Sequence, residues 1–113
     1  MKRGDIYFAD LDPTIGDEIK KRRPVLIVSN DANNKMSNTV TIVPITSNIK
    51  KIYPFEVLLE TKYSGLSVPS KAQCHQIRTI SKIRIQQKKA GHVSNSSVIS
   101  QLESAIKLHL ELM

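Results

Sequence analysis

Four consecutive basic residues, Lys20, Lys21, Arg22 and Arg23, run directly into an apolar segment that begins at Pro24. An arginine guanidinium grips a phosphate through a planar fork of N–H donors, and a rigid strand behind it would hold that fork still. The chain carries 17 Lys and Arg against 10 Asp and Glu, a formal net charge of +7. Taken alone, Arg23 fits a solvated loop cation equally well. Together, the cluster and the net charge predict an anionic ligand, with nucleic acid favoured over a membrane surface.

Further polar residues stand beside predicted strands. Thr46 and Ser47 place two hydroxyls directly after an apolar run, although hydroxyls at such positions more often form turns. Lys50 and Lys51 form a second basic pair in the turn that follows. Glu18 precedes the basic cluster, where a carboxylate can simply balance charge. These residues are candidates for a site because functional groups concentrate on loops that rigid strands support.

A last polar group lies in the run Gln73-Cys74-His75-Gln76-Ile77-Arg78-Thr79. A strand over 70–76 would place Ala72 and Cys74 on one face, and Lys71, Gln73 and His75 on the other. The simplest interpretation of His75 is an exposed strand residue, and that of Cys74 is a small buried apolar one. Arg78, near the end of this run, is a second candidate arginine.

The composition, 40% hydrophobic and 24% charged, predicts one ordinary globular domain over residues 1–113. No signal peptide and no apolar run of roughly 20 residues is present, which favours a soluble, cytoplasmic protein without a membrane partner. The single cysteine allows no internal disulfide, and the three histidines lack metal-ligand spacing, so neither a metal nor a cofactor is expected. With five aromatic residues and no Trp, nucleic-acid contacts should rely on charge and hydrogen bonds more than on base stacking.

The elements that must position these residues are mostly short strands. Alternating or β-branched runs bounded by turn residues predict strands over 5–10, 24–29, 39–45, 55–59, 70–76 and 88–93, with a mobile loop at 13–23, a turn at 30–34 and a short helical turn within 81–87. Ser94 is the expected N-cap of one C-terminal helix. That helix carries a single apolar stripe: Val98, Ile99, Leu102, Ala105, Ile106, His109, Leu110 and Met113. The predicted fold is mainly β, a small curved antiparallel sheet or open barrel closed by a C-terminal helix.

The order of short motifs resembles the MazF/PemK family of toxin endoribonucleases over nearly the whole chain. The matching motifs are Gly4-Asp5-Ile6-Tyr7, Asp10-Leu11-Asp12-Pro13, Gly16-Asp17-Glu18, Arg23-Pro24-Val25-Leu26-Ile27, Pro44-Ile45-Thr46, Tyr53-Pro54-Phe55-Glu56-Val57 and Gln76-Ile77-Arg78-Thr79-Ile80. Each motif is weak by itself, and their shared order and spacing carry the resemblance. It implies an SH3-like antiparallel barrel with a C-terminal helix, forming a homodimer whose groove takes single-stranded RNA.

The resemblance further implies metal-independent, sequence-specific cleavage of mRNA, blocked by a cognate acidic antitoxin. Arg23 and Thr46 match the arginine and threonine that the family uses at the scissile phosphate. Attack of a ribose 2′-OH on phosphorus builds charge that a guanidinium and a hydroxyl can stabilise. The RNA-binding residues expected around them are Glu18, Lys20, Lys21, Arg22, Ser47, Lys50, Lys51, Gln76 and Arg78.

Several positions depart from the family pattern. His75 stands where relatives commonly have Asp or Glu, and some relatives of the PemK type have arginine at Gln73 and histidine at Asp17. The acid and base of those relatives therefore do not carry over, and Ile19 replaces a frequent glutamine. His75, with a reference pKa near 6.5, is a candidate for acid–base work or for reading a base. Two alternatives stay open: an RNA-binding module without activity, and a gyrase-binding toxin of the same fold.

Overall fold

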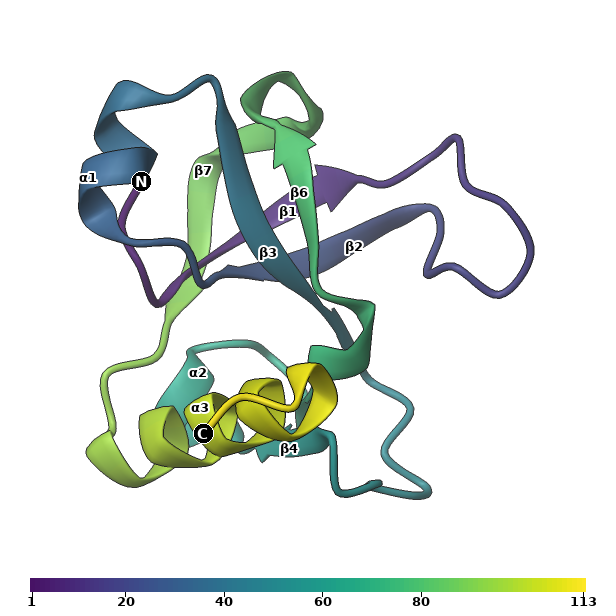
Figure 1. Cartoon of the computed structure of the whole chain (residues 1–113). Helices are drawn as coiled ribbons and strands as arrows, with labels where there is room; N and C mark the ends of the chain where they lie inside the picture. Colours follow the sequence, from purple (N-terminus) through teal and green to yellow (C-terminus); the bar gives the residue numbers. More distant parts are fainter.

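The computed structural model describes all 113 residues as one curved antiparallel sheet with a long helix at its C-terminal end (Figure 1). The strands are β1 (Asp5–Asp10), β2 (Arg22–Ile27), β3 (Thr39–Thr46), β4 (Glu56–Leu59), β5 (Ser70–Gln73), β6 (Arg78–Ser81) and β7 (Ile85–His92). The helices are α1 (Asp31–Met36), α2 (Thr61–Ser64) and α3 (Ser96–Leu110), with short 3-10 turns η1 (Cys74–Gln76) and η2 (Lys82–Arg84). The predicted mainly β fold with a C-terminal helix is confirmed.

The sheet follows the order β4-β5-β3-β2-β1-β7, and β6 pairs with the first half of β3. All of its ladders are antiparallel. β4, β6 and β7 each have one neighbour, so the curved sheet forms an open barrel. The long β3 serves both β5 and β6 along one edge because these strands pair with its opposite ends.

Apolar side chains cover both faces of the central strands. Along β2, Val25 and Ile27 enter one buried cluster with residues of β1, β3 and β6, while Leu26 enters another beneath α3. Burial on both faces explains why this strand is a continuous apolar run rather than an alternating one. The prediction of a buried strand in this region is therefore confirmed, although the strand begins two residues earlier, at Arg22.

The α3 helix covers the sheet with only part of its apolar stripe. Val98, Leu102 and Ala105 are buried in the core, whereas His109, Leu110 and Met113 are exposed. Asn95, and not Ser94, is the N-cap, since its side chain accepts a hydrogen bond from the Val98 N–H. No helix is long and apolar enough to span a membrane.

Besides the N-cap of α3, other local predictions were wrong. The turn at 30–34 is instead the beginning of α1, because the Asn30 side chain caps it by accepting from the Asn33 N–H. The strand predicted over 70–76 ends at Gln73 and turns into η1, which removes His75 from the strand. β6 is a separate strand, and β7 begins three residues before position 88. Cys74 is fully buried, as its apolar interpretation required.

Candidate active site

The ends of β2 and β3 bring Arg23 and Thr46 to matching positions. The last paired residues of this ladder are Val25 and Pro44, and two further residues along the same register place Arg23 opposite Thr46. Both side chains are half-buried, and both line one open cavity of about 470 Å³. The sheet therefore brings together two residues whose types alone did not distinguish a site from a loop cation and a turn hydroxyl.

The cavity wall comes from five regions that are distant in sequence. Its lining residues are Phe8, Arg22, Arg23, Pro24, Ile45, Thr46, Ser47, Gly65, Leu66, Ser67, Val68, Ser70 and Ala90. The segment after α2 forms one side, and it lies close to Gly91 on β7, where a Cβ would overlap the Ser64 carbonyl oxygen. An arginine, hydroxyls and a small-residue wall suit a phosphate with its sugar more than a hydrophobic ligand.

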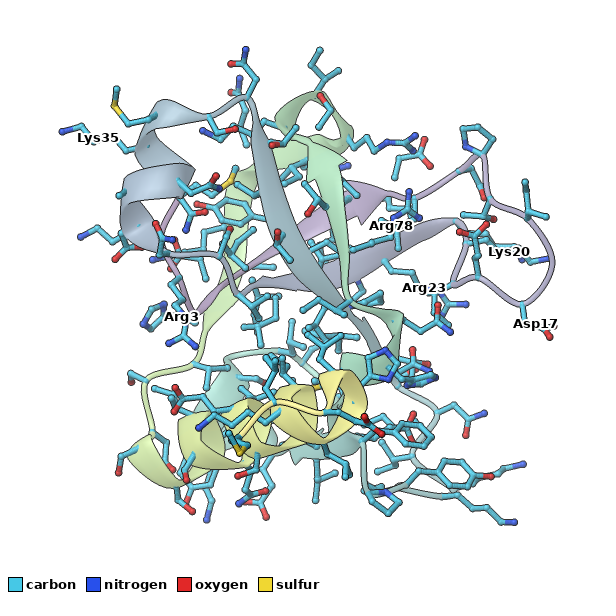
Figure 2. The ribbon with its side chains drawn as sticks, viewed as in Figure 1. Arg3, Asp17, Lys20, Arg23, Lys35 and Arg78 are labelled. Carbon is cyan, nitrogen blue, oxygen red and sulfur yellow. The ribbon has the colours of Figure 1, made fainter.

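The loop between β1 and β2 projects from the body of the molecule and carries Asp17 and Lys20 (Figure 2). Its base is closed by the Leu11 N–H, which donates to the Lys21 carbonyl at 3.1 Å. Lys21 has a φ of 69°, the left-handed conformation that turns the chain into β2. Lys20 and Lys21 are exposed, whereas Arg23 donates from Nε to the Lys20 carbonyl at 3.2 Å, which orients its guanidinium.

Three predicted RNA-binding residues already have partners within the protein. Arg22 donates to Gln86 Oε1 at 2.8 Å and lies 5.0 Å over the Phe8 ring. Glu18 accepts the Ile15 N–H within the loop. Arg78 donates to the Leu11 carbonyl at 3.5 Å, at the base of that loop. Two of these contacts lie within or at the base of the loop between β1 and β2, which carries Lys20 and Lys21.

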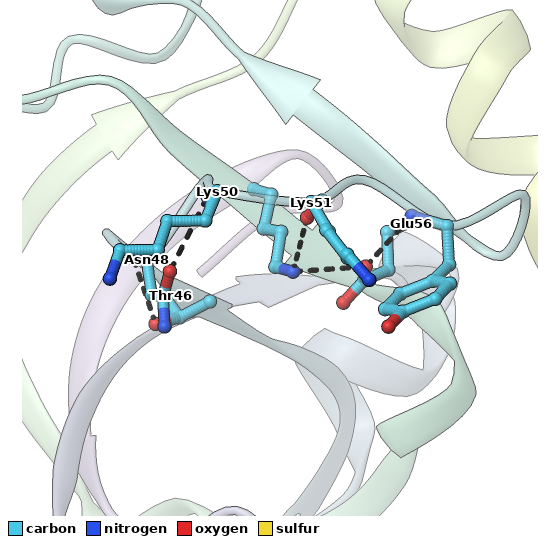
Figure 3. A network of polar contacts seen from close by, with 7 residues as sticks. Thr46, Asn48, Lys50, Lys51 and Glu56 are labelled. Carbon is cyan, nitrogen blue, oxygen red and sulfur yellow. Dashed lines mark hydrogen bonds and ion pairs between the residues drawn. The ribbon is translucent and has the colours of Figure 1, made fainter.

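A second loop, 47–55, leaves β3 directly after Thr46 (Figure 3). The Asn48 N–H donates to Thr46 Oγ1 at 3.2 Å, and the Lys50 N–H donates to Asn48 Oδ1 at 3.4 Å. Ser47, Lys50 and Lys51 are exposed on this loop. The loop therefore extends the positive surface away from Thr46.

A buried ion pair anchors the 47–55 loop to the sheet. Lys71 Nζ lies 3.0 Å from Glu56 Oε1 and donates to the Lys51 carbonyl at 2.7 Å. Lys71 is also the β5 residue paired with Thr46. The prediction that Lys71 shares a polar strand face with His75 was wrong, because Lys71 is buried and His75 lies in η1.

His75 is outside the residues that line the Arg23–Thr46 cavity. Its ring packs on Phe55 at 4.4 Å between centroids, and its Nδ1 is buried without a hydrogen-bond partner. Burial, followed by the nearby His109 and Lys71 charges, lowers the pKa of His75 even though Glu56 opposes the shift. The imidazole is consequently neutral at pH 7. Gln76 is half-buried in the same turn.

Sequence reasoning missed the small-residue wall at 65–70 and the anchoring pair of Glu56 and Lys71. The Gly, Ser and Pro content of 65–70 signals a loop, but nothing in it signals which groove the loop lines. Lys71 carried no signal, since a lysine is seldom buried unless it is paired. No cluster of three or more His, Cys, Asp or Glu side chains forms a metal-binding group.

The curved sheet, the basic loop and the cavity lined by arginine and hydroxyl side chains together define a small open β-barrel protein with a basic, polar cavity at one end of two central strands. The model of a family described as PemK-like, MazF-like toxins of type II toxin–antitoxin systems matches residues 2–110. The chain belongs to this family.

Named relatives resemble the chain along its whole length. It is 45% identical to endoribonuclease MazF9 of Mycobacterium tuberculosis, over 99% of this chain and 98% of the relative. It is 37% identical to endoribonuclease EndoA of Bacillus subtilis, over 100% and 97%. Among solved structures, M. tuberculosis toxin MazF-mt6 superposes with a TM-score of 0.79 at 28% identity, over 96% of this chain and 98% of that one. A Deinococcus radiodurans MazE-MazF structure has a TM-score of 0.78 at 22% identity, over 100% and 98%.

Proposed function

We propose that this chain is a sequence-specific, metal-independent endoribonuclease, the toxin of a type II toxin–antitoxin system. The observation that carries the proposal is the matched placement of Arg23 and Thr46 on one cavity wall. Relatives at 45% and 37% identity are named endoribonucleases, and both align over almost the whole chain. The substrate is single-stranded mRNA, drawn in by the net charge of +7 and the exposed lysines of the two loops.

The cleavage step is an internal transfer of the phosphoryl group. The ribose 2′-oxygen attacks the adjacent phosphorus and loses its proton, the bond from phosphorus to the 5′-oxygen breaks, and that oxygen takes up a proton. The products are a 2′,3′-cyclic phosphate and a 5′-hydroxyl. Arg23 stabilises the negative charge that builds on the non-bridging oxygens, and the Thr46 hydroxyl donates to the same group. Neither role needs a metal or a cofactor.

His75 enters the proposal as the group for proton transfer. Its lowered pKa leaves a neutral imidazole at pH 7, which is the form that accepts a proton. Because His75 lies against Phe55 and not in the cavity wall, this role requires the scissile ribose to reach from the cavity to within hydrogen-bond distance of the His75 ring. Gln76 and Arg78 follow His75 in the chain and would contact the same RNA.

The proposed partners are an acidic antitoxin and a second copy of the chain. A mycobacterial endoribonuclease structure with a TM-score of 0.79 is titled as a complex with its cognate antitoxin. An extended acidic segment would compete with RNA for Lys20, Lys21 and Arg23, since it carries the same sign of charge. We place the protein in the cytoplasm, where mRNA is found.

The proposal is tested by incubating purified protein with single-stranded RNA in excess chelator. Fragments that end in 2′,3′-cyclic phosphate, and that disappear with Arg23→Ala and with Thr46→Ala, are expected. The same sequence as DNA should stay intact because it lacks the attacking hydroxyl. Binding without cleavage would instead indicate an inactive RNA-binding module. Inhibition of DNA supercoiling with intact RNA would indicate a gyrase-directed toxin.

A further inference from the structure

Two of the chain's five aromatic residues stack on each other within the 47–55 loop. The Tyr53 and Phe55 rings are nearly parallel, with 5.5 Å between centroids and 9° between planes. His75 packs against Phe55 at 4.4 Å. Tyr53 is 48% exposed, whereas Phe55 and His75 are half-buried. The three rings therefore form a row that leads from half-buried His75 and Phe55 to the exposed Tyr53 ring.

We propose that Tyr53, backed by Phe55, is a stacking site for one nucleobase of single-stranded RNA. This inference deepens the proposed function and rests on it. Base–aromatic stacking serves single-stranded nucleic acid because every base has a flat π-face. The low aromatic content predicts few base-stacking contacts overall. The fold nevertheless places two of the five aromatic rings together in the loop that carries Lys50 and Lys51.

The Tyr53 backbone is fixed before any ligand arrives. Its N–H donates to Glu56 Oε1 at 3.0 Å, and its carbonyl accepts the Glu56 N–H at 2.8 Å. Lys71 Nζ lies 5.8 Å from the centre of the Tyr53 ring, within the range of a cation–π contact. A base that stacks here meets a preorganised ring, so little conformational entropy is lost on binding.

Lys71 connects this stacking site to the candidate active site. It pairs with Thr46 across β5 and β3, and its ammonium lies beside the Tyr53 ring. Lys50 and Lys51 are exposed on the loop between Thr46 and Tyr53 (Figure 3). An RNA strand with its scissile phosphate at Thr46 can therefore place backbone phosphates near these lysines and a base on Tyr53.

The charge around Tyr53 favours a nucleobase over a protein partner as its occupant. An aromatic side chain flanked by exposed lysines complements a chain of bases and phosphates. Exposed apolar residues near the end of α3, Leu108 and Leu112, offer a surface of different character for a second copy of the chain. A protein contact at Tyr53 is the competing outcome in the experiment.

The test uses a ten-nucleotide 2′-O-methyl oligouridylate with a single 2-aminopurine, which is bright in the free probe because uridines stack weakly. This probe cannot be cleaved because its 2′-oxygens are blocked, and its fluorescence falls when the 2-aminopurine stacks on an aromatic ring. We expect quenching with the wild-type protein and with Tyr53→Phe. Tyr53→Leu, which keeps an apolar side chain but removes the ring, should abolish quenching and weaken binding about 5- to 150-fold. Tyr63→Leu, the matched change at another tyrosine with a lysine over its ring, should retain both.

Thermal melting of each variant checks that it is folded. Equal quenching and affinity for Tyr53→Leu and the wild type would overturn the stacking site, and so would a change in oligomeric state with unchanged quenching. RNA cleavage by the wild type, measured in parallel, separates the two proposals. Cleavage without Tyr53-dependent quenching leaves the endoribonuclease and removes the stacking site. Tyr53-dependent quenching without cleavage would support the stacking site and contradict the endoribonuclease.

Discussion

Arg23 on β2 faces Thr46 on β3, two residues beyond the last paired positions of their ladder. The strands separate there, and the gap opens into the cavity that both side chains line. Neither residue depends on a mobile loop for its position, because each lies at the end of a strand beside buried residues, Val25 to Ile27 on β2 and Ile42 to Ile45 on β3. A guanidinium and a hydroxyl fixed in this way can act on the same phosphate.

In the proposed reaction Arg23 and Thr46 act on the same phosphate, so the effects of removing them should not multiply. We expect Arg23→Ala and Thr46→Ala each to lower the single-turnover cleavage rate about 10²- to 10³-fold, the typical loss for one preorganised donor. The double variant should lose little more than the worse single variant, since residues that act as a unit are strongly non-additive. Losses that multiply would show that the two side chains act on separate steps.

The exposed lysines of the projecting loop should affect RNA capture and not chemistry. We expect Lys20→Ala and Lys21→Ala each to reduce the slope of log binding constant against log salt by about 0.7, the value for one contact with single-stranded nucleic acid. The rate at saturating RNA should stay unchanged. Lys35→Ala in α1, on the opposite side of the molecule (Figure 2), is the matched control and should change neither quantity. A fall in saturated rate for Lys20→Ala comparable to that of Arg23→Ala would contradict this division.

Sequence patterns were sufficient for the strands that carry Arg23 and Thr46 but not for their pairing. The apolar run after Pro24 and the β-branched run before Thr46 each predict a strand from local chemistry. The register that makes the two ends meet depends on long-range packing, which no local pattern contains. His75 shows the same limit, since β5 ends at Gln73 and the chain turns into η1, which the alternating pattern of residues 70–76 does not indicate.

The buried pair of Lys71 and Glu56 should reveal itself through an asymmetry in stability. Their side chains are 10% and 2% exposed, so Lys71→Met leaves the Glu56 carboxylate buried without its cation. Such losses typically cost about 3–5 kcal/mol of unfolding free energy. The double variant Lys71→Met/Glu56→Met removes both charges and should recover most of that loss. Urea unfolding at pH 7 measures both values, and a double variant as unstable as the single one would show that packing, not charge, dominates here.

Asp5 should contribute to stability in a way that is lost in acid. Burial acts to raise the pKa of Asp5, but the Lys2 N–H, His92 and Lys89 more than offset it, and the net shift is downward. A carboxyl with a lowered folded pKa stabilises the protein above its unfolded pKa near 3.9, and this contribution disappears as pH falls through the folded value. Asp5→Asn should lower the free energy of unfolding by about 1.5–3 kcal/mol at pH 7, the range for hydrogen bonds to charged groups. On acidification, the free energy of unfolding should fall less for this variant than for the wild type. Urea unfolding of both proteins at pH 7 and pH 3 checks this prediction. If the free energy of unfolding fell equally in the two proteins, Asp5 would not be a source of the acid sensitivity.

The downward pKa shift of His75 predicts the pH range in which cleavage should be lost. A folded pKa below 6.5 means that His75 can accept a proton throughout the neutral range and loses that ability only in more acidic solution. The pH profile of kcat/KM should therefore show an acidic limb below pH 6.5. His75→Ala should remove this limb and lower single-turnover cleavage at neutral pH at least tenfold. An unchanged rate and profile would exclude His75 from proton transfer.

The neighbouring His109 provides the control for that assignment. Its ring lies 6.5 Å from the His75 ring, and its charge helps to lower the pKa of His75. His109→Gln removes this charge, so the pKa of His75 should rise and the acidic limb should move to higher pH. The rate on the neutral plateau should stay the same, because His109 itself transfers no proton in the proposed reaction. If His109→Gln lowered the plateau and left the limb in place, the limb would belong to another group, and the role given to His75 would be wrong.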